Sequence, residues 1–157
     1  MLRSLRHFYL SLIIVVSGVA LCGCPSNVWN ELPDNISSFI ARYYPGQGVS
    51  DYTVTDDGSR VEMSNGATLV FDSKDNWTTI DGNGSRLPEV LAYDQLPPAL
   101  FQYLKETGNA DASYKIERTS STYIITLEDT YITYDVDSST VTYPTAPQAS
   151  SKNAGDS

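Results

Sequence analysis

Hydrophobic and polar residues alternate over short stretches along most of this chain. The clearest example is the range 65–81, which reads as a turn, a strand, a second turn and a second strand. In its first strand, one face carries Ala67, Leu69 and Phe71. The opposite face carries Thr68, Val70 and Asp72. Asn65-Gly66 precedes this strand and predicts a type I′ hairpin turn, in which both central residues adopt positive φ.

A stretch of residues with the spacing of an amphipathic helix precedes these strands. Apolar residues at positions i, i+3, i+4 and i+7 form a single stripe of Ile36, Phe39, Ile40 and Tyr43. Pro33 and Asp34 suit the first turn of a helix, and Tyr44-Pro45-Gly46 ends it, because a residue before proline avoids the α region. A helix this short is marginal in isolation. We therefore expect its apolar stripe to be buried against the strands that follow.

The same order of elements occurs twice. Leu96-Pro97 repeats Leu32-Pro33 at a spacing of 64 residues and opens a second helical stripe, which one helical turn at residues 87–91 precedes. The first set of strands is Val49–Thr55, Arg60–Met63, Ala67–Asp72 and Trp77–Asp81. The second set is Ala112–Thr119, Thr122–Leu127, Thr130–Asp135 and Thr140–Tyr143. The sequence thus predicts a repeat over residues 32–86 and 87–143.

The size of each repeat favours a shared core. A unit of about 55 residues buries only about 60% of its chain surface and is marginally stable alone. Joining two sheets edge to edge adds a common core and covers two strand edges. The predicted fold is α+β: a tandem repeat of a helix plus a four-stranded antiparallel sheet, forming one continuous sheet with the helices on one face. Two separable domains are the less favoured alternative.

The first residues indicate export. Arg3 and Arg6 precede the apolar stretch 10–21, which is shorter than the ~20 residues of a membrane-spanning helix. Leu21-Cys22-Gly23-Cys24 resembles a bacterial lipobox, which makes residues 1–23 a lipoprotein signal peptide and Cys24 the lipidation site. An ordinary secretory signal that contains two cysteines is the alternative. Residues 24–31 are then a tether, and residues 144–157 are predicted to be a disordered tail.

The lipobox also bears on localisation. Proline rather than aspartate follows Cys24. By resemblance to Gram-negative sorting rules, this favours the outer membrane, and we expect a lipid-anchored envelope protein that faces the periplasm.

Charge and composition exclude several classes of function. The chain has 10 bases, 19 acids and one histidine. Without residues 1–23 it keeps eight bases and 19 acids, a net charge of −11, which argues against nucleic-acid binding. His7 leaves with the signal and Cys24 carries lipid, so Ser-His-Asp and Cys-His catalysis and histidine- or thiolate-ligated zinc are excluded. We expect no enzyme activity, cofactor or metal.

A family resemblance rests on the turn and strand motifs. Tyr44-Pro45-Gly46, Asp56-Asp57-Gly58, Asn65-Gly66, Phe71-Asp72 and Trp77 together resemble the PepSY-like domain of β-lactamase-inhibitor-like envelope lipoproteins. The resemblance spans residues 32–143 and is looser in the second repeat. It implies a helix on a four-stranded antiparallel sheet, twice, in a periplasmic or outer-membrane protein. Fold alone does not fix function.

The predicted sheet has a face turned away from the helices. We expect it to be an aromatic surface that binds a protein or peptide partner, since tyrosine and tryptophan are enriched at such interfaces. The residues assigned to partner binding are Trp77, Tyr131, Tyr52, Thr68 and Thr133. The alternative is that some of these aromatic side chains pack against loops or sheet edges.

Two other chemistries are weaker candidates. The turns 72–76 and 81–84 offer clustered oxygen ligands, but neither has the spacing of an EF-hand, and Asp, Asn and Gly are ordinary turn residues. Asp51, Asp57 and Glu62 could be imagined as paired carboxylates of a hydrolase, although solvated acids are the usual case.

The favoured function is a lipid-anchored binding module that acts on a protein or peptidase through the exposed sheet face, in the manner of an inhibitor. The alternatives are an accessory envelope lipoprotein without an inhibitory target, and a small-ligand sensor.

Overall fold

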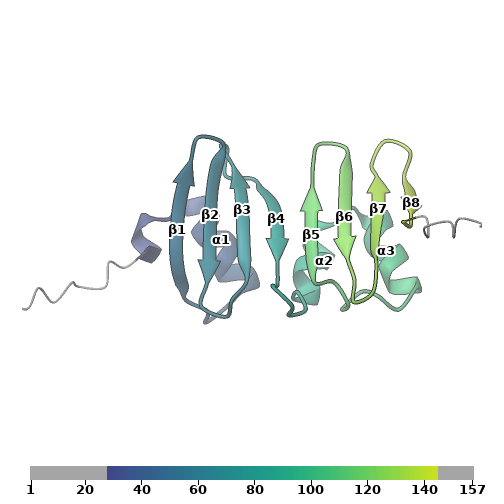
Figure 1. Ribbon diagram of the computed structural model, residues 1–157, viewed down its shortest axis with the longest axis horizontal. Helices are drawn as coiled ribbons and strands as arrows, with labels where there is room; N and C mark the ends of the chain where they lie inside the picture. Colours follow the sequence, from purple (N-terminus) through teal and green to yellow (C-terminus); the bar gives the residue numbers. More distant parts are fainter. Residues whose placement is uncertain (1–27, 145–157) are drawn as a thin grey trace, which may run out of the picture.

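The computed structural model describes residues 28–144 (Figure 1). The predicted signal peptide, Cys24 and residues 145–157 lie outside this part. The helices are η1 (Val28–Glu31), α1 (Asp34–Tyr43), α2 (Glu89–Gln95) and α3 (Pro98–Glu106). The strands are β1 (Val49–Thr55), β2 (Gly58–Met63), β3 (Thr68–Asp72), β4 (Trp77–Asp81), β5 (Lys115–Arg118), β6 (Thr122–Thr126), β7 (Tyr131–Asp135) and β8 (Thr140–Thr142). Among these residues no helix has the length and apolarity needed to cross a membrane.

The eight strands form one antiparallel sheet in sequence order, from β1 at one edge to β8 at the other. This confirms the α+β class and the single continuous sheet. The bounds of β1 and β4 agree with the prediction. The connection before α3 is more helical than expected, because α2 has seven residues rather than one turn. β5 is shorter than expected, since Ala112 and Ser113 lie in the loop that precedes it.

A row of aliphatic side chains crosses the sheet and forms the centre of the core. Its members are paired in register on neighbouring strands and are fully buried: Val61, Leu69, Ile80, Ile116, Ile125 and Ile132. In Figure 1 the three α-helices lie behind the sheet. Ile36 and Ile40 of α1 and Leu100 and Leu104 of α3 complete the core. Each such side chain contributes about 1.5–3 kcal/mol on burial, which offsets part of the entropy lost when the chain is ordered.

The two halves of the sheet meet at β4 and β5. Three residue pairs join these strands, between positions 79–81 and 115–117. Polar contacts between α1 and α2 reinforce this junction. Arg42 Nε and Nη2 donate to Asp94 Oδ2 at 2.9 and 2.6 Å, and Gln95 Nε2 donates to the Tyr43 hydroxyl at 2.6 Å.

Two local predictions were wrong. The turn at Asn65-Gly66 is not type I′, because only Gly66 has positive φ (90°). Gly66 N donates to Met63 O and Met63 N to Ala67 O, which describes a type I turn closed by a glycine bulge. The tether also ends earlier than expected. Residues 28–31 form η1, and Trp29 packs against the core because its ring is large and apolar.

Candidate binding surface

One face of the sheet points toward the viewer in Figure 1 and is called the front face here. Its residues follow from the strand register, because directly paired residues share a face. One row across it is Asp51, Glu62, Thr68, Asp81, Lys115, Thr126 and Tyr131. A second row is Thr53, Arg60, Val70, Thr79, Glu117, Ile124, Thr133 and Thr142. Thr55, Asp72, Thr122, Asp135 and Thr140 lie beyond the second row. Threonine is the commonest residue in these rows, and Tyr131 is the one aromatic residue among them.

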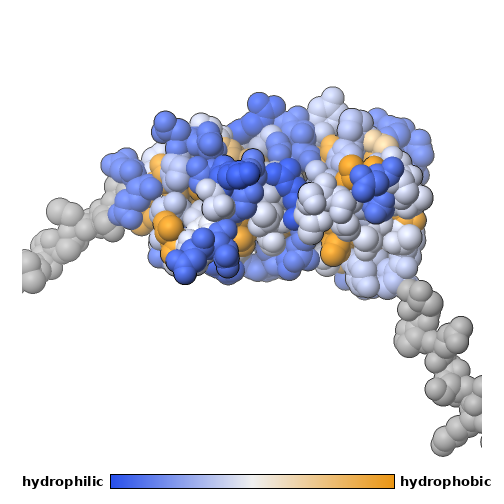
Figure 2. Space-filling model, turned by 90° about the horizontal axis from the view of Figure 1, so that it is seen from above, coloured by the Kyte–Doolittle hydropathy of each residue, from blue (hydrophilic) through white to orange (hydrophobic). Residues whose placement is uncertain are grey.

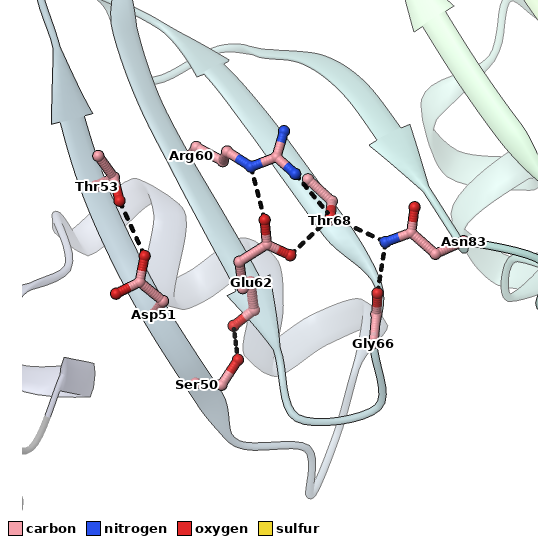
Figure 3. A network of polar contacts seen from close by, with 8 residues as sticks. All are labelled: Ser50, Asp51, Thr53, Arg60, Glu62, Gly66, Thr68 and Asn83. Atoms are coloured by element: carbon pink, nitrogen blue, oxygen red, sulfur yellow. Dashed lines mark hydrogen bonds and ion pairs between the residues drawn. The ribbon is translucent and has the colours of Figure 1, made fainter.

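Hydrogen bonds hold the polar side chains of the first half of the front face in fixed positions (Figure 3). Glu62 accepts from Arg60 Nε at 2.6 Å and from the Thr68 hydroxyl at 2.8 Å. Asn83 Nδ2 donates to the Gly66 carbonyl at 2.6 Å and to the Thr68 hydroxyl at 3.0 Å. Thr68 is therefore only 3% exposed although it lies on the front face. This network ties the loop after β4 to the β2–β3 turn.

The middle of the front face combines charge with a shallow hollow. Lys115 Nζ lies 3.1 Å from Glu117 Oε1 and 3.8 Å from Asp81 Oδ2. Beside it is a hollow of about 240 Å³ at the junction of β4, β5 and β6. The hollow is lined by Thr78, Thr79, Glu117, Arg118, Thr119, Thr122 and Ile124. An apolar floor with a carboxylate and hydroxyls around it can accept the side chain of a docked protein.

The structure places three of the five predicted partner-binding residues on the front face. Thr68 is covered by its neighbours, Thr133 is half-buried, and Tyr131 is 45% exposed. Trp77 and Tyr52 lie on the opposite face, so the prediction of an aromatic open surface was wrong for these two residues. Tyr52 is directly paired with the buried Val61 and packs against the core from the edge strand β1.

A β-bulge explains the position of Trp77. Strict alternation from Ile80 would place Trp77 on the front face. In β4, however, Thr78 is an extra residue: Thr79 pairs with Val70, and Trp77 pairs with Phe71. An extra residue turns every side chain beyond it to the other face. Trp77 consequently faces the helices and is 3% exposed.

Trp77 makes several contacts at the junction of the two halves. Its Nε1 donates to Gln95 Oε1 at 2.7 Å, and its carbonyl accepts from Arg118 Nε at 2.6 Å. The Arg118 guanidinium lies 3.9 Å from the centre of the indole ring, within the range of a cation–π contact. The Tyr123 ring packs edge-on against the indole. Trp77 thus belongs to the core of the junction.

The two oxygen-rich turns use their carboxylates as caps. Asp72 Oδ1 accepts from the backbone N–H groups of Asn76 and Lys74, and these bonds lower the pKa of Asp72. Asp81 Oδ1 accepts from the backbone N–H of Asn83. Within residues 28–144 no group of three or more acidic, histidine or cysteine side chains could hold a metal ion.

The three acids considered for hydrolysis do not form a site. Asp51 lies opposite Glu62 on the front face, but Glu62 is bonded to Arg60 and Thr68, and Asp51 accepts from the Thr53 hydroxyl. Asp57 lies in the β1–β2 turn, at the other end of these strands.

Sequence reasoning missed a second hollow, on the helix layer. Tyr93 of α2 is 65% exposed and packs edge-on against Phe101 of α3, with ring centres 5.2 Å apart. Glu89, Val90 and Lys105 complete this hollow of about 350 Å³. Tyr93 lies outside the predicted one-turn helix at 87–91, so no periodic signal placed it beside α3.

The comparisons with known proteins agree with this fold. The family described as "Putative beta-lactamase-inhibitor-like, PepSY-like" matches residues 29–76 and 57–140. Among solved structures, a putative periplasmic protein of the DUF2874 family from Bacteroides vulgatus is 28% identical, with a TM-score of 0.59 over 73% of this chain and 90% of that one. A second putative periplasmic protein from B. vulgatus, of unknown function, is 24% identical, with a TM-score of 0.63 over 74% and 94%.

A third solved structure carries a functional description. A putative calcium-regulated periplasmic protein from Bacteroides thetaiotaomicron is 24% identical, with a TM-score of 0.63 over 74% of this chain and 93% of that one. At this identity the likeness shows the fold alone. No curated protein matches the chain. None of these descriptions names an enzymatic activity. Because the two family matches together span residues 29–140, the chain belongs to the PepSY-like family of β-lactamase-inhibitor-like proteins.

Proposed function

We propose that this chain is a lipid-anchored periplasmic protein that binds a basic protein surface on the front face of its sheet, in the manner of an inhibitor. The observation that carries the proposal is the charge of that face. Its register includes the acids Asp51, Glu62, Asp72, Asp81, Glu117 and Asp135, and the bases Arg60 and Lys115. Six acids against two bases complement a basic partner, which speeds encounter and selects against acidic ones.

The hollow beside Glu117 gives this surface a place for an anchor side chain. Binding energy at protein interfaces concentrates in a few side chains that fill desolvated pockets. Ile124 provides an apolar floor, and Glu117 can pair with an incoming lysine or arginine. Tyr131 and Thr133 extend the contact toward β7. The fixed network around Thr68 limits the entropy lost on docking, since these side chains are already held in place.

The architecture of the chain supports the proposal. We infer a tandem repeat of a helix and four strands, with the helices on one face, from the Leu-Pro spacing of 64 residues and the order of the elements. Such a repeat leaves one broad face for a partner. We also propose lipidation at Cys24 and attachment to the outer membrane. The lipobox supports the anchor, and the periplasmic relatives support the compartment.

Site-directed photo-crosslinking tests the front face. A benzophenone amino acid placed at position 133 in living cells should give a protein adduct, because Thr133 lies on the front face. The matched control is position 93, an exposed tyrosine on the helix layer. Adducts from position 93 but not from position 133, or from neither position, would contradict the proposal.

A second experiment separates inhibition from an accessory role. The protein isolated as the adduct should lose activity, if it is an enzyme, when this chain is added in excess. Glu117→Lys should weaken that effect, and Glu89→Lys on the helix layer should not. For the anchor, Cys24→Ser should release the protein from the membrane fraction and abolish palmitate incorporation.

A further inference from the structure

We propose that the free edge of β1 binds a basic, extended peptide segment of a partner protein as an added strand. Within residues 28–144, β1 is the first strand of the sheet and pairs only with β2, so one of its two edges has no neighbouring strand in this part of the chain. η1 lies against β1, but within residues 28–144 no backbone hydrogen bond joins the two elements. An exposed edge strand offers N–H and C=O groups for pairing with another chain.

The hydrogen-bond pattern identifies which backbone groups of β1 are available. In an antiparallel sheet the N–H and C=O of one residue point to the same side, and the side alternates along the strand. Met63 N donates to Ala67 O, so Val61 and Ser59, two and four residues earlier, also bond to β3. Tyr52 is opposite Val61, and Val54 is opposite Ser59. The N–H and C=O groups of Tyr52 and Val54 therefore point away from β2, to the edge that lacks a neighbouring strand in the described residues.

The same two residues line a cavity of about 190 Å³ at the end of the sheet where the β1–β2 and β3–β4 turns lie. Val54 is 68% exposed, more than any other large apolar residue in the described part of the chain. The buried Ser59 hydroxyl, which also lines the cavity, has no hydrogen-bond partner there. Buried hydroxyl groups in proteins usually have a hydrogen-bond partner, and a bound peptide could supply it here. An added strand would place one of its side chains beside Val54, at the mouth of this cavity.

Charge identifies the chemistry of that side chain. Asp72 at the end of β3 and Asp75 of the β3–β4 turn line the cavity, and Asp56 and Asp57 form the adjacent β1–β2 turn. The residues 55–58 and 72–76 together hold these four acids and one base, Lys74, a net charge of −3. Figure 2 views the molecule from this end and shows hydrophilic residues over most of it, with isolated hydrophobic patches between them. A lysine or arginine fits, because its alkyl stem can cover Val54 while its charge reaches the carboxylates.

The same charges disfavour a second copy as the occupant. Antiparallel pairing of two β1 strands through Tyr52 and Val54 would place Asp51 opposite Thr55 of the other copy, next to Asp56. Like charges would then meet at both ends of the new pair, which costs stability. A basic strand from another protein avoids this repulsion.

Hydrogen exchange measured by NMR tests the proposal on the purified protein. The probe is a blocked nine-residue peptide in which lysine alternates with valine. Its binding should slow amide exchange at Tyr52 and Val54 by at least about tenfold, because these amides gain acceptors. The amides of Thr53 and Thr55, which point to β2, should keep their rates. A peptide with glutamate in place of lysine should bind at least about tenfold more weakly.

Two further measurements show whether the contact is through the backbone. Val54→Pro removes an outward N–H without breaking a bond to β2 and should weaken peptide binding about tenfold, whereas Val54→Thr should change it less than about twofold. If the proline variant does not fold, a peptide N-methylated at alternate residues gives the same test on the unchanged protein. Equal affinity for the methylated and unmethylated peptides would overturn the proposal. Slower amide exchange confined to front-face residues such as Thr133 would also overturn it. So would slower exchange at Tyr52 and Val54 that depends on the protein concentration in the absence of peptide.

Discussion

Replacement of Trp77 by alanine tests whether the junction of the two half-sheets is a structural core. The indole is 3% exposed, donates to Gln95 and lies under the Arg118 guanidinium. Truncation of a buried tryptophan costs about 3–5 kcal/mol, because apolar contacts are lost and a cavity remains. Domains of this size are stable by about 5–15 kcal/mol, so the loss is a large fraction of the total. We expect Trp77→Ala to be among the most damaging single changes in the chain.

The assay is urea unfolding followed by far-UV circular dichroism, which does not depend on the fluorescence of the residue removed. The expected loss corresponds to a midpoint shift of about 2 M for a typical urea dependence. Trp77→Phe keeps a ring but removes the N–H to Gln95, and should cost about 1–2 kcal/mol.

The matched control is Tyr131→Ala on the front face, which should change stability by no more than about 0.5 kcal/mol. If Trp77→Ala costs less than about 1 kcal/mol, the assignment of Trp77 to the core is wrong. A larger cost for Tyr131→Ala than for Trp77→Ala would refute it equally.

Three further predictions concern Tyr44, Asp72 and Gly58. Burial raises the pKa of Tyr44, whose hydroxyl lacks a hydrogen-bond partner, from 10 to about 12, so the fold should lose stability as pH rises from 10 to 12. Tyr44→Phe should remove this loss and stabilise the protein by about 1–2 kcal/mol in urea titrations at pH 7. The lowered pKa of Asp72 stabilises the fold above pH 3.8, and this contribution is lost as pH falls through the pKa of Asp72 in the folded protein. Asp72→Asn should therefore reduce the loss of stability at acid pH, and an unchanged loss would contradict this. Gly58 has a φ of 150°, and a Cβ there would lie 2.0 Å from the Phe71 carbonyl oxygen. Gly58→Ala should therefore lower the free energy of unfolding, measured by thermal unfolding, by about 3 kcal/mol or more. Gly66→Ala should lower it by about 1 kcal/mol, because the space around Gly66 is open.

The alternation of apolar and polar residues correctly predicted which face of β3 is buried. Period-two alternation placed Leu69 and Phe71 in the core and Thr68 on the other face, and the strand register agrees. The helical stripe of α1 likewise identified Ile36 and Ile40 as core residues. These assignments succeed because burial of a sheet face or a helix stripe follows from the spacing of side chains along one element.

Which residues lie on the front face depended on strand pairing, which the spacing of residues along one strand does not give. Thr78 is an ordinary threonine in the sequence, and only its pairing against Val70 and Phe71 makes it the extra residue that turns Trp77 into the core. Tyr52 faces the helix side because of its partner Val61 on β2.

The sequence by itself determined the α+β class, the order of helices and strands, the acidic charge and the absence of histidine beyond position 7. These are local or summed properties of the chain. Only the tertiary structure decided which aromatic residues are exposed, where the halves join, and which backbone groups of β1 point away from β2. Register, bulges and sheet edges arise from contacts between segments far apart in the chain, and no window of residues around one position encodes them.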